Sequence, residues 1–315
     1  MKLHLDRTAF EFIIDQTAKT NGVRRDVLEK DYYVTLLLYE LSQKENQGYA
    51  YFKGGTALYK ALRSIRRFSE DIDLTVFTED CPTNSQAQKR LENAALRFKS
   101  MQKGETLENR RGSITCLYSY DSLYDLDVTD ALQRFGNVKV EATSFTVSEP
   151  TEKIEIAPHL YELCDETQKN ILQEQYDIKP FVIETISLER IFIDKVFAAE
   201  FYYLRNELSD VAKHVYDLTV LLQNGRIIEF LADKAAVQKI VALKRREELS
   251  RKGGVDPNEE IVNFRYFIGL KGKKEFETKF FDMQKVYVLD KKDALTIEEV
   301  MTSIQKLRNI LDIEW

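Results

Sequence analysis

The feature that most constrains this chain is a glycine pair, Gly54 and Gly55, followed at short range by two carboxylates, Asp71 and Asp73. Successive side chains of a β-strand point to opposite faces, so the two aspartates share one face of a predicted strand while Ile72 points to the core. Carboxylates on one face repel each other unless a cation lies between them, and Mg²⁺ prefers oxygen ligands. The spacing therefore predicts a divalent metal site on a strand.

The glycine pair indicates a phosphate site. Glycine lets the backbone approach a ligand closely, and backbone amides at the start of a helix bind phosphate oxygens. Thr56 adds a hydroxyl ahead of a helix predicted over 57–66. A glycine pair alone is usually only a turn, and an Asp-x-Asp pair alone is usually a solvated strand edge or loop. Together, joined by one helix, the two motifs indicate nucleotide chemistry.

Residues 52–58 read Phe-Lys-Gly-Gly-Thr-Ala-Leu, and residues 67–74 read Arg-Phe-Ser-Glu-Asp-Ile-Asp-Leu. The pair resembles the signature of DNA-polymerase-β-type nucleotidyltransferases. More narrowly, it is similar to the AbiEii-type nucleotidyltransferase toxins of bacterial toxin–antitoxin and phage-defence (abortive-infection) systems. The run over 28–35 also fits that family. The resemblance covers roughly residues 25–220, with four motifs in the family's order, whereas residues beyond about 225 carry no recognised motif.

The resemblance implies metal-dependent transfer of a nucleoside monophosphate from an NTP to an acceptor hydroxyl, with release of pyrophosphate. Two Mg²⁺ ions are the expected cofactors, with Mn²⁺ as an alternative. The expected acceptor is an RNA 3′ end, tRNA above all, and a cognate antitoxin is an expected protein partner; no DNA or membrane partner is expected. Two alternatives stay open: a housekeeping nucleotidyltransferase outside toxin–antitoxin systems, and a catalytically inactive module that binds nucleotide or RNA.

A two-metal phosphoryl-transfer site needs a third carboxylate, which holds the second metal and helps to remove a proton from the attacking hydroxyl. Glu141 lies on an apolar-alternating strand predicted over 138–147, where it could equally be a solvent-facing glutamate. Related chains carry a Lys-hydrophobic-Glu strand at this point, and the resemblance therefore favours Glu141. Three other acids compete with Glu141 for this role, but they lie in a predicted loop, where aspartates more often form turns: Asp125, Asp127 and Asp130.

Further candidates lie on two predicted helices, 187–206 and 209–223. Lys195 lies at the edge of an apolar stripe, where a lysine is ordinarily just solvated; it matches a family Asp/Glu-Lys pair, which implies that it neutralises the triphosphate. Lys213 and His214 precede Asp217 by one helical turn, so the three can share a face. The resemblance makes Asp217 a partner that orients Lys195 or contacts nucleotide, whereas the spacing alone allows an ordinary intrahelical ion pair.

Two of these residues need qualification. Lys213 stands where the family usually has arginine, and lysine cannot make a bidentate fork. His214 is expected to make a supporting hydrogen bond, with a general base as the alternative.

The candidate catalytic residues are Asp71, Asp73, Glu141, Lys195 and Asp217, of which the first three are the candidate metal ligands. The candidate nucleotide-binding residues are Lys53, Gly54, Gly55, Thr56, Lys60, Arg67, Ser69, Lys195, Lys213 and His214.

Composition limits the other classes of function. The chain has 315 residues, of which 43% are hydrophobic and 31% charged, without an apolar run of the about 18 residues that a membrane span needs. The N-terminus lacks a secretory signal and the three cysteines are scattered, which predicts reduced thiols in the cytoplasm. A net charge of −6 does not by itself indicate nucleic-acid binding. Basic clusters at 244–246, 251–252 and 271–274 are interpreted as solvated surface charge.

The residue pattern predicts an α/β (α+β) fold with two domains. Residues 1–165 are expected to form a nucleotidyltransferase core, in which a small mixed sheet flanked by helices carries the acids, and residues 166–315 a mainly helical domain that completes the nucleotide site. Strand patterns fade after about residue 165. Expected helices outside those already given are two over 7–46 broken at Asn21–Gly22, then 84–100, 166–174, 231–251 and 296–311; expected strands are 71–77, 113–120, 138–147 and a short edge strand at 154–156.

Overall fold

The computed structural model of the chain describes residues 1–43, 49–124, 135–146, 149–251 and 253–312. The chain divides into two compact units. Unit 1 comprises Met1–Ala57 and Glu70–Thr185, and unit 2 comprises Leu58–Ser69 and Ile186–Trp315. The expected boundary at residue 165 thus differs from the observed division after Thr185, and a short segment next to the glycine pair belongs with the helical unit.

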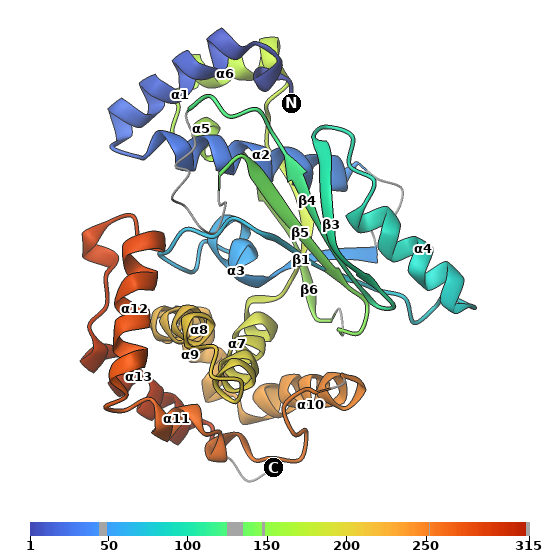
Figure 1. Cartoon of the computed structure of the whole chain (residues 1–315). Helices are drawn as coiled ribbons and strands as arrows, with labels where there is room; N and C mark the ends of the chain where they lie inside the picture. The colour runs from blue at the N-terminus through green and yellow to red at the C-terminus, as the bar shows by residue number, and fades with distance from the viewer. Residues whose placement is uncertain (44–48, 125–134, 147–148, 252, 313–315) are drawn as a thin grey trace. The chain divides into compact units, whose positions relative to one another are not determined.

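Unit 1 is built on a mixed seven-stranded sheet of order β3-β4-β5-β2-β1-β7-β6 (Figure 1). Its strands are β1 (Ala50–Lys53), β2 (Ile72–Val76), β3 (Gln102–Arg110), β4 (Ser113–Ser119), β5 (Asn137–Thr143), β6 (Thr151–Ile156) and β7 (Phe181–Ile186). β2 pairs antiparallel with β1, which places Asp73 opposite Lys53. On its other side β2 pairs parallel with β5, which places Asp73 opposite Glu141. The motif strand is therefore central in the sheet.

Alternation along the central strands separates an apolar face from a polar face. Ile72, Leu74 and Val140 are fully buried on the apolar face. Helix α4 (Asn84–Ala95) contacts β2, β4 and β5, and helix α2 (Arg25–Ser42) contacts β5. Because neighbouring residues of a strand point to opposite faces, the acids at the alternate positions lie on the polar face.

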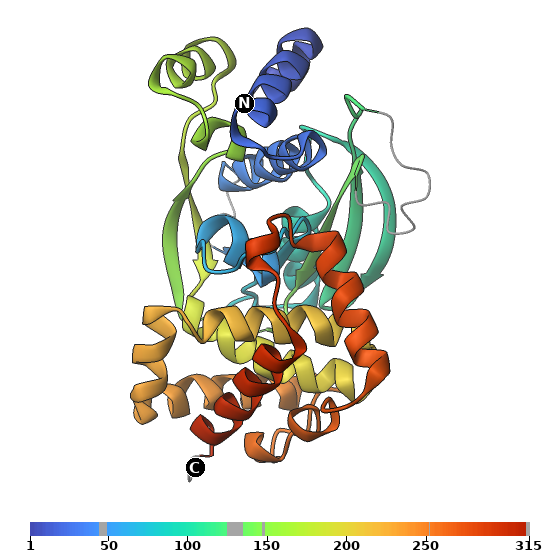
Figure 2. The ribbon, with the colours of Figure 1, turned by 90° about the vertical axis from the view of Figure 1, so that its left-hand side faces the viewer.

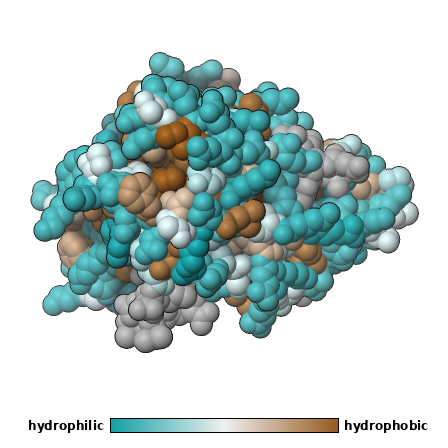
Figure 3. All heavy atoms as spheres, turned by 90° about the horizontal axis from the view of Figure 1, so that it is seen from above, coloured by the Kyte–Doolittle hydropathy of each residue, from teal (hydrophilic) through white to brown (hydrophobic). Residues whose placement is uncertain are grey.

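The other helices of unit 1 are α1 (Arg7–Asn21), the single turn α3 (Gly54–Thr56), α5 (His159–Glu162) and α6 (Glu166–Tyr176), with a 3₁₀ turn η1 (Leu3–Leu5). Apolar side chains of α1 and α6 line a hollow of about 420 Å³, on the face seen from above in Figure 3. Phe12 and Ile171 on its wall are 63% and 43% exposed.

Unit 2 is helical in its described part and is centred on α8 (Leu208–Leu221), which packs against α7 (Leu188–Tyr203), α12 (Lys274–Tyr287) and α13 (Ile297–Ile310) (Figure 2). Its remaining elements are α9 (Gly225–Ala232), α10 (Lys234–Ser250), α11 (Tyr266–Gly269), η4 (Ile261–Asn263) and η5 (Lys291–Asp293). The segment 58–69 is held in this unit by a backbone hydrogen bond from the Phe68 amide to the Tyr287 carbonyl, 2.8 Å long.

Most expected elements are confirmed. The fold is mixed α/β, α1 ends at Gly22 in a left-handed conformation, and β6 lies at the edge of the sheet. The last helix begins with the expected capping box, in which Thr296 and Glu299 satisfy each other's backbone amides. No helix in the described ranges is long and apolar enough to cross a bilayer.

The structure departs from the expected elements in four places. The motif helix predicted over 57–66 is the turn α3 and a π-helical turn η3 (Ala57–Ala61), after which Arg63 adopts a positive φ. The helix predicted over 231–251 is confirmed as α10, but α9 before it, which ends where Asp233 caps α10, was not predicted. β3 was missed because it is polar and largely exposed along its length. β7 (Phe181–Ile186) was missed because only helices were expected after about residue 165.

Candidate active site

The polar face of the sheet brings together the acids predicted from the sequence. Asp71 immediately precedes β2 and Asp73 lies within it, while Ile72 between them is fully buried, as expected. Glu141 on β5 is the register partner of Asp73 on the neighbouring strand. Directly opposite residues on one face have Cβ atoms about 5 Å apart, so the two carboxylates are neighbours. The competing residues Asp125, Asp127 and Asp130 lie outside the described residues.

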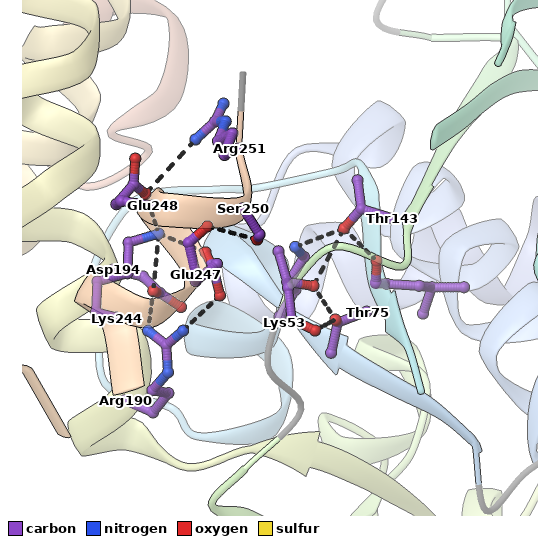
Figure 4. Close-up of polar contacts among 12 residues, drawn as sticks. Lys53, Thr75, Thr143, Arg190, Asp194, Lys244, Glu247, Glu248, Ser250 and Arg251 are labelled. Atoms are coloured by element: carbon purple, nitrogen blue, oxygen red, sulfur yellow. Dashed lines mark hydrogen bonds and ion pairs between the residues drawn. The ribbon is translucent and has the colours of Figure 1, made fainter. Parts of the chain in front are cut away.

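Two lysines accompany the acids on this face. The Nζ atom of Lys139 lies 2.7 Å from Oε1 of Glu141 and 3.0 Å from Oδ2 of Asp71. Lys53, the register partner of Asp73, donates from Nζ to the Thr143 hydroxyl at 3.1 Å, the contact drawn in Figure 4. Lys53 was expected to contact nucleotide. Lys139 was not among the predicted site residues, although its spacing from Glu141 places both on one strand face.

The charges around Asp73 explain an unusual titration. Burial first, and then the negative charges of Glu141 and Asp71, raise the pKa of Asp73 to about 7. Lys53 and Lys139 oppose this rise. Burial lowers the pKa of Lys139, but Asp71 and Glu141 outweigh burial and raise it above its ordinary value. A pKa near neutrality is typical of an aspartate that binds a metal cation or transfers a proton.

The glycine pair comes close to these acids. Gly54 has φ of +77°, and a Cβ atom built on it would lie 2.0 Å from Oδ2 of Asp73. The position therefore excludes any side chain for two reasons, the left-handed backbone and the contact with Asp73. Gly55 and Thr56 are buried in the short turn α3 that follows. The backbone of the predicted phosphate cradle thus approaches the carboxylates within unit 1.

The donor set fits a hard divalent cation in chemistry, since three carboxylates on adjacent strands supply only oxygen ligands. The missing Cβ of Gly54 keeps Oδ2 of Asp73 accessible at the closest approach. Among the described residues, however, no three acidic, histidine or cysteine side chains converge in a metal-ligand arrangement. Asp71 and Glu141 instead each pair with the ammonium group of Lys139.

Unit 2 carries the second set of predicted residues. Asp217 on α8 is fully buried and accepts a bidentate fork from Arg67, with Nε at 2.7 Å and Nη2 at 2.8 Å. Lys195 on α7 lies 2.8 Å from the same carboxylate and is only 6% exposed, so the alternative of an ordinary solvated lysine does not describe it. Burial raises the pKa of Asp217, but the charges of Arg67 and Lys195 outweigh burial and lower it to about 2.

This geometry favours one of the two roles considered for Asp217, which is to orient Lys195. Its oxygens are engaged by Arg67 and Lys195 within the unit. The expectation that Arg67 contacts phosphate stays a prediction, and its 4% exposure favours a positioning role instead. The spacing-based alternative for Asp217, an ion pair within α8, does not describe the contacts observed. Lys213 instead pairs with Asp210, one turn earlier on the same helix.

His214 lies beside this network with its ring stacked on Tyr202, at a centroid distance of 5.3 Å. Its buried Nδ1 has no hydrogen-bond partner among the described residues. Burial, followed by the charge of Lys195, lowers the pKa of His214 well below its ordinary value, so the ring is neutral near pH 7. Of the remaining predicted residues, Lys60 is buried and Ser69 half-buried in the segment 58–69.

A second buried ionic cluster joins α7 to α10 and is drawn on the left of Figure 4, with Arg190 at its lower end. Arg190 is 1% exposed and pairs with Asp194 and with Glu247, the latter at 2.6 Å. Lys244 pairs with Glu247 and Glu248 and is 5% exposed. The expectation that the 244–246 cluster is solvated surface charge was therefore wrong for Lys244, because acids of two helices surround it.

Comparison with known proteins gives the family of the chain. No curated protein gave a significant sequence match to the chain. A family model described as "Nucleotidyl transferase AbiEii toxin, Type IV TA system" matches residues 36–294. The match spans more than half of the 315 residues; it begins within the region 25–220 in which the motifs were recognised, after the run 28–35, and ends beyond that region. It includes the glycine pair, the acids of β2 and β5, and the residues of α7 and α8 described above. The chain belongs to the AbiEii nucleotidyltransferase toxin family.

Proposed function

We propose that the protein is a metal-dependent nucleotidyltransferase that transfers a nucleoside monophosphate from an NTP to the 3′ hydroxyl of an RNA, with tRNA as the favoured acceptor, and that it acts in the cytoplasm as the toxin of a toxin–antitoxin pair. The observation that carries the proposal is the register of β2 with β5, which sets Asp73 beside Glu141, together with the approach of Gly54 to Asp73. Carboxylates for a divalent cation and a backbone turn for phosphate are thereby combined in one place.

The roles follow from phosphoryl-transfer chemistry, which requires positioning and charge neutralisation more than covalent catalysis. Asp71, Asp73 and Glu141 would hold Mg²⁺, which when bound neutralises the phosphate charge that builds up during transfer. The amides of Gly54 and Gly55 would bind phosphate oxygens. Glu141 would accept the proton of the attacking hydroxyl. The acids themselves argue against an inactive binding module, since a pocket without chemistry has no use for three carboxylates on one face.

The reaction is tested with each of four labelled NTPs, total RNA and Mg²⁺ or Mn²⁺. We expect label from one or more nucleotides to enter RNA, and Asp73→Ala to abolish the transfer. The matched control is Asp80→Ala, which removes an exposed aspartate paired with Arg90. Equal incorporation by wild type and Asp73→Ala, or no incorporation from any NTP by wild type, would contradict the reaction assigned.

The biological role is tested by induction in a bacterial host. A toxin should arrest growth, and Asp71→Ala should relieve the arrest. Co-expression of the protein encoded beside the gene should also relieve it if that protein is the antitoxin. An active enzyme whose induction is harmless would instead support the housekeeping alternative.

Lys195 would act as a compact cation toward the triphosphate, a role supported by its match to the family motif. Replacing Lys195 by alanine should then lower the transfer rate by roughly 30- to 1,000-fold, the effect of losing about 2–4 kcal/mol of electrostatic stabilisation. Because Lys195 is buried, we also expect Lys195→Ala to be less stable than wild type. The rates are therefore compared at a temperature at which circular dichroism shows that the variant is folded. An unchanged rate in folded Lys195→Ala would exclude this role.

A further inference from the structure

The position of Lys139 raises the question of what a lysine does at the centre of a cation site. Its ammonium group lies between Asp71 and Glu141, within 3.0 Å of an oxygen of each. It comes from the same strand face as Glu141, two residues earlier on β5. The two acids that it joins belong to different strands, so Lys139 links β5 to the start of β2 across the polar face.

These contacts and a bound divalent cation compete for the same carboxylates. Mg²⁺ requires ligand oxygens at about 2.0–2.1 Å in near-octahedral geometry. Each carboxylate has a second oxygen, but a cation bound through it would still lie within a few ångströms of the ammonium group, and two positive charges that close repel each other. The ion pairs of Lys139 with Asp71 and Glu141 therefore oppose the binding of a metal that these acids share with Asp73.

The side chain of Lys139 can move away from the two acids. Its side-chain atoms are 33% exposed, whereas those of Lys195 in unit 2 are only 7% exposed and lie against a fully buried carboxylate. A lysine has four rotatable bonds and a strongly hydrated head group, so it can leave the acids for solvent without backbone change. Asp71 and Glu141 are each 41% exposed and are equally free to rotate.

We propose that Lys139 is an internal counter-cation that occupies the space between Asp71 and Glu141 in the metal-free protein, and that a divalent cation must displace it. The lysine then has two effects. It relieves the repulsion among the three carboxylates when no metal is bound, and it weakens metal affinity by the free energy of the two ion pairs that binding breaks. This inference rests on the proposed metal-dependent function, and its test separates the two.

The test measures Mn²⁺ and Mg²⁺ binding to the full chain without nucleotide, by calorimetry and by the paramagnetic resonance of free Mn²⁺. Lys139→Met removes the charge and keeps much of the length of the side chain. We expect it to lower the Kd for Mn²⁺ about tenfold at low ionic strength, on the scale of two partly exposed ion pairs. High salt should narrow the difference, because it screens exposed pairs. The matched control is Lys153→Met, which breaks the ion pair of Lys153 with Glu184 on the same sheet and should leave the Kd unchanged.

Unfolding gives a second readout on the same proteins. Metal-free Lys139→Met should melt at a lower temperature than wild type, and saturating Mn²⁺ should raise its melting temperature by more than it raises that of wild type. An unchanged or higher Kd in folded Lys139→Met, with Asp73→Asn abolishing binding, would overturn the inference and leave the metal site in place. Absence of metal binding in both wild type and Lys139→Met would overturn the proposed metal dependence as well.

A measurement on wild type avoids any folding defect of the variant. Reductive dimethylation modifies amines that are free of ion pairs faster than paired ones. If the metal displaces Lys139, saturating Mg²⁺ should increase the labelling of Lys139 several-fold, as read by peptide mass spectrometry, with Lys153 as the internal reference. Equal or reduced labelling of Lys139 with Mg²⁺ would show that the lysine stays in place and would refute the displacement.

Discussion

Single residues of the polar face show how backbone and charge act together. Gly54 and Gly22 both adopt left-handed φ values, +77° and +67°, yet their surroundings differ. A Cβ on Gly22 would meet no atom within 4 Å, whereas a Cβ on Gly54 would meet the Asp73 carboxylate. Substitution by alanine would therefore strain the backbone at both positions, but only at Gly54 would the new methyl group also clash with a candidate metal ligand.

This pair gives a first prediction. Gly54→Ala and Gly22→Ala should each lose about 1–2 kcal/mol of unfolding free energy, the cost of a left-handed conformation for an L residue. Only Gly54→Ala should also lower Mn²⁺ affinity and transfer activity, by at least about tenfold, since Asp73 must rotate away from the new methyl group. Urea unfolding and calorimetry check both effects. Full metal affinity in Gly54→Ala would show that the close approach has no functional consequence.

Asp73 gives a prediction about pH. Its pKa of about 7 in the folded state is above the ordinary value of 3.8, so the folded protein holds this proton more tightly than the unfolded chain. The resulting stabilisation is complete below about pH 4 and is lost as the pH rises through 7. In metal-free protein, Asp73→Asn should therefore gain stability over wild type at pH 8, on the order of 4 kcal/mol, and gain less than about half of that at pH 5.

Urea unfolding with a chelator at both pH values measures this difference, with Asp282→Asn, an exposed aspartate of α12, as control. The same linkage predicts that Mg²⁺ binds more tightly as the pH rises from 6 to 8, because the metal competes with the proton on Asp73. A gain of equal size at pH 5 and pH 8 would contradict the assignment of the titration to Asp73.

Among the elements, α7 is joined to two neighbouring helices by buried ion pairs. It carries Lys195, which contacts Asp217 on α8, and Arg190, which contacts Glu247 on α10. Buried ion pairs of this kind add little net stability over apolar packing, but removing one partner leaves an uncompensated charge. The two contacts therefore tie α7 to both of its neighbours in one arrangement.

The α7–α10 contact gives the third prediction. Glu247→Gln should lower the unfolding free energy by about 3 kcal/mol, because Arg190 and Lys244 lose a buried negative partner. Glu189→Gln, on α7, breaks an exposed pair with Arg226 and should cost less than about 1 kcal/mol. Denaturant unfolding compares the two. Similar losses would mean that the buried cluster is no more important to α7 than a surface pair.

At the scale of the whole molecule, the chain passes between the two units three times, after Ala57, after Ser69 and after Thr185. Both units are therefore discontinuous in sequence. Ile65 and Phe68 of the short segment are 6% and 4% exposed, and Arg67 has its acid partner on α8. A cut of the chain between the units would leave these apolar groups and one charged group without their surroundings.

The fourth prediction follows. A fragment of residues 1–185 should aggregate or show weak near-ultraviolet circular dichroism, because it carries 58–69 without the helices that bury it. Co-expression with 186–315 should restore a soluble pair that co-elutes in size exclusion. The control is the 1–185 fragment with Ile65 and Phe68 changed to serine, which should be more soluble than the unaltered fragment. A monomeric, natively packed 1–185 fragment would contradict the discontinuous division.

Local pattern was sufficient for the fold class, for the capping box of α13 and for the common face of Asp71 and Asp73, because these depend on alternation, periodicity and capping chemistry within a few residues. It also placed Glu141 on a strand, with the family resemblance needed to favour it. Polar β3 carried no such pattern, and it became a strand only by pairing with β4.

Contacts between distant residues decided the rest. The contact of Lys139 with Asp71, the fork of Arg67 on Asp217 and the approach of Lys244 to Asp194 each join groups far apart in the chain. The sequence of one segment states which charges are present, but their partners depend on the register of the strands and the packing of the helices. The sequence by itself thus determined the chemistry of the polar face, and the tertiary structure decided which of its charges are already paired.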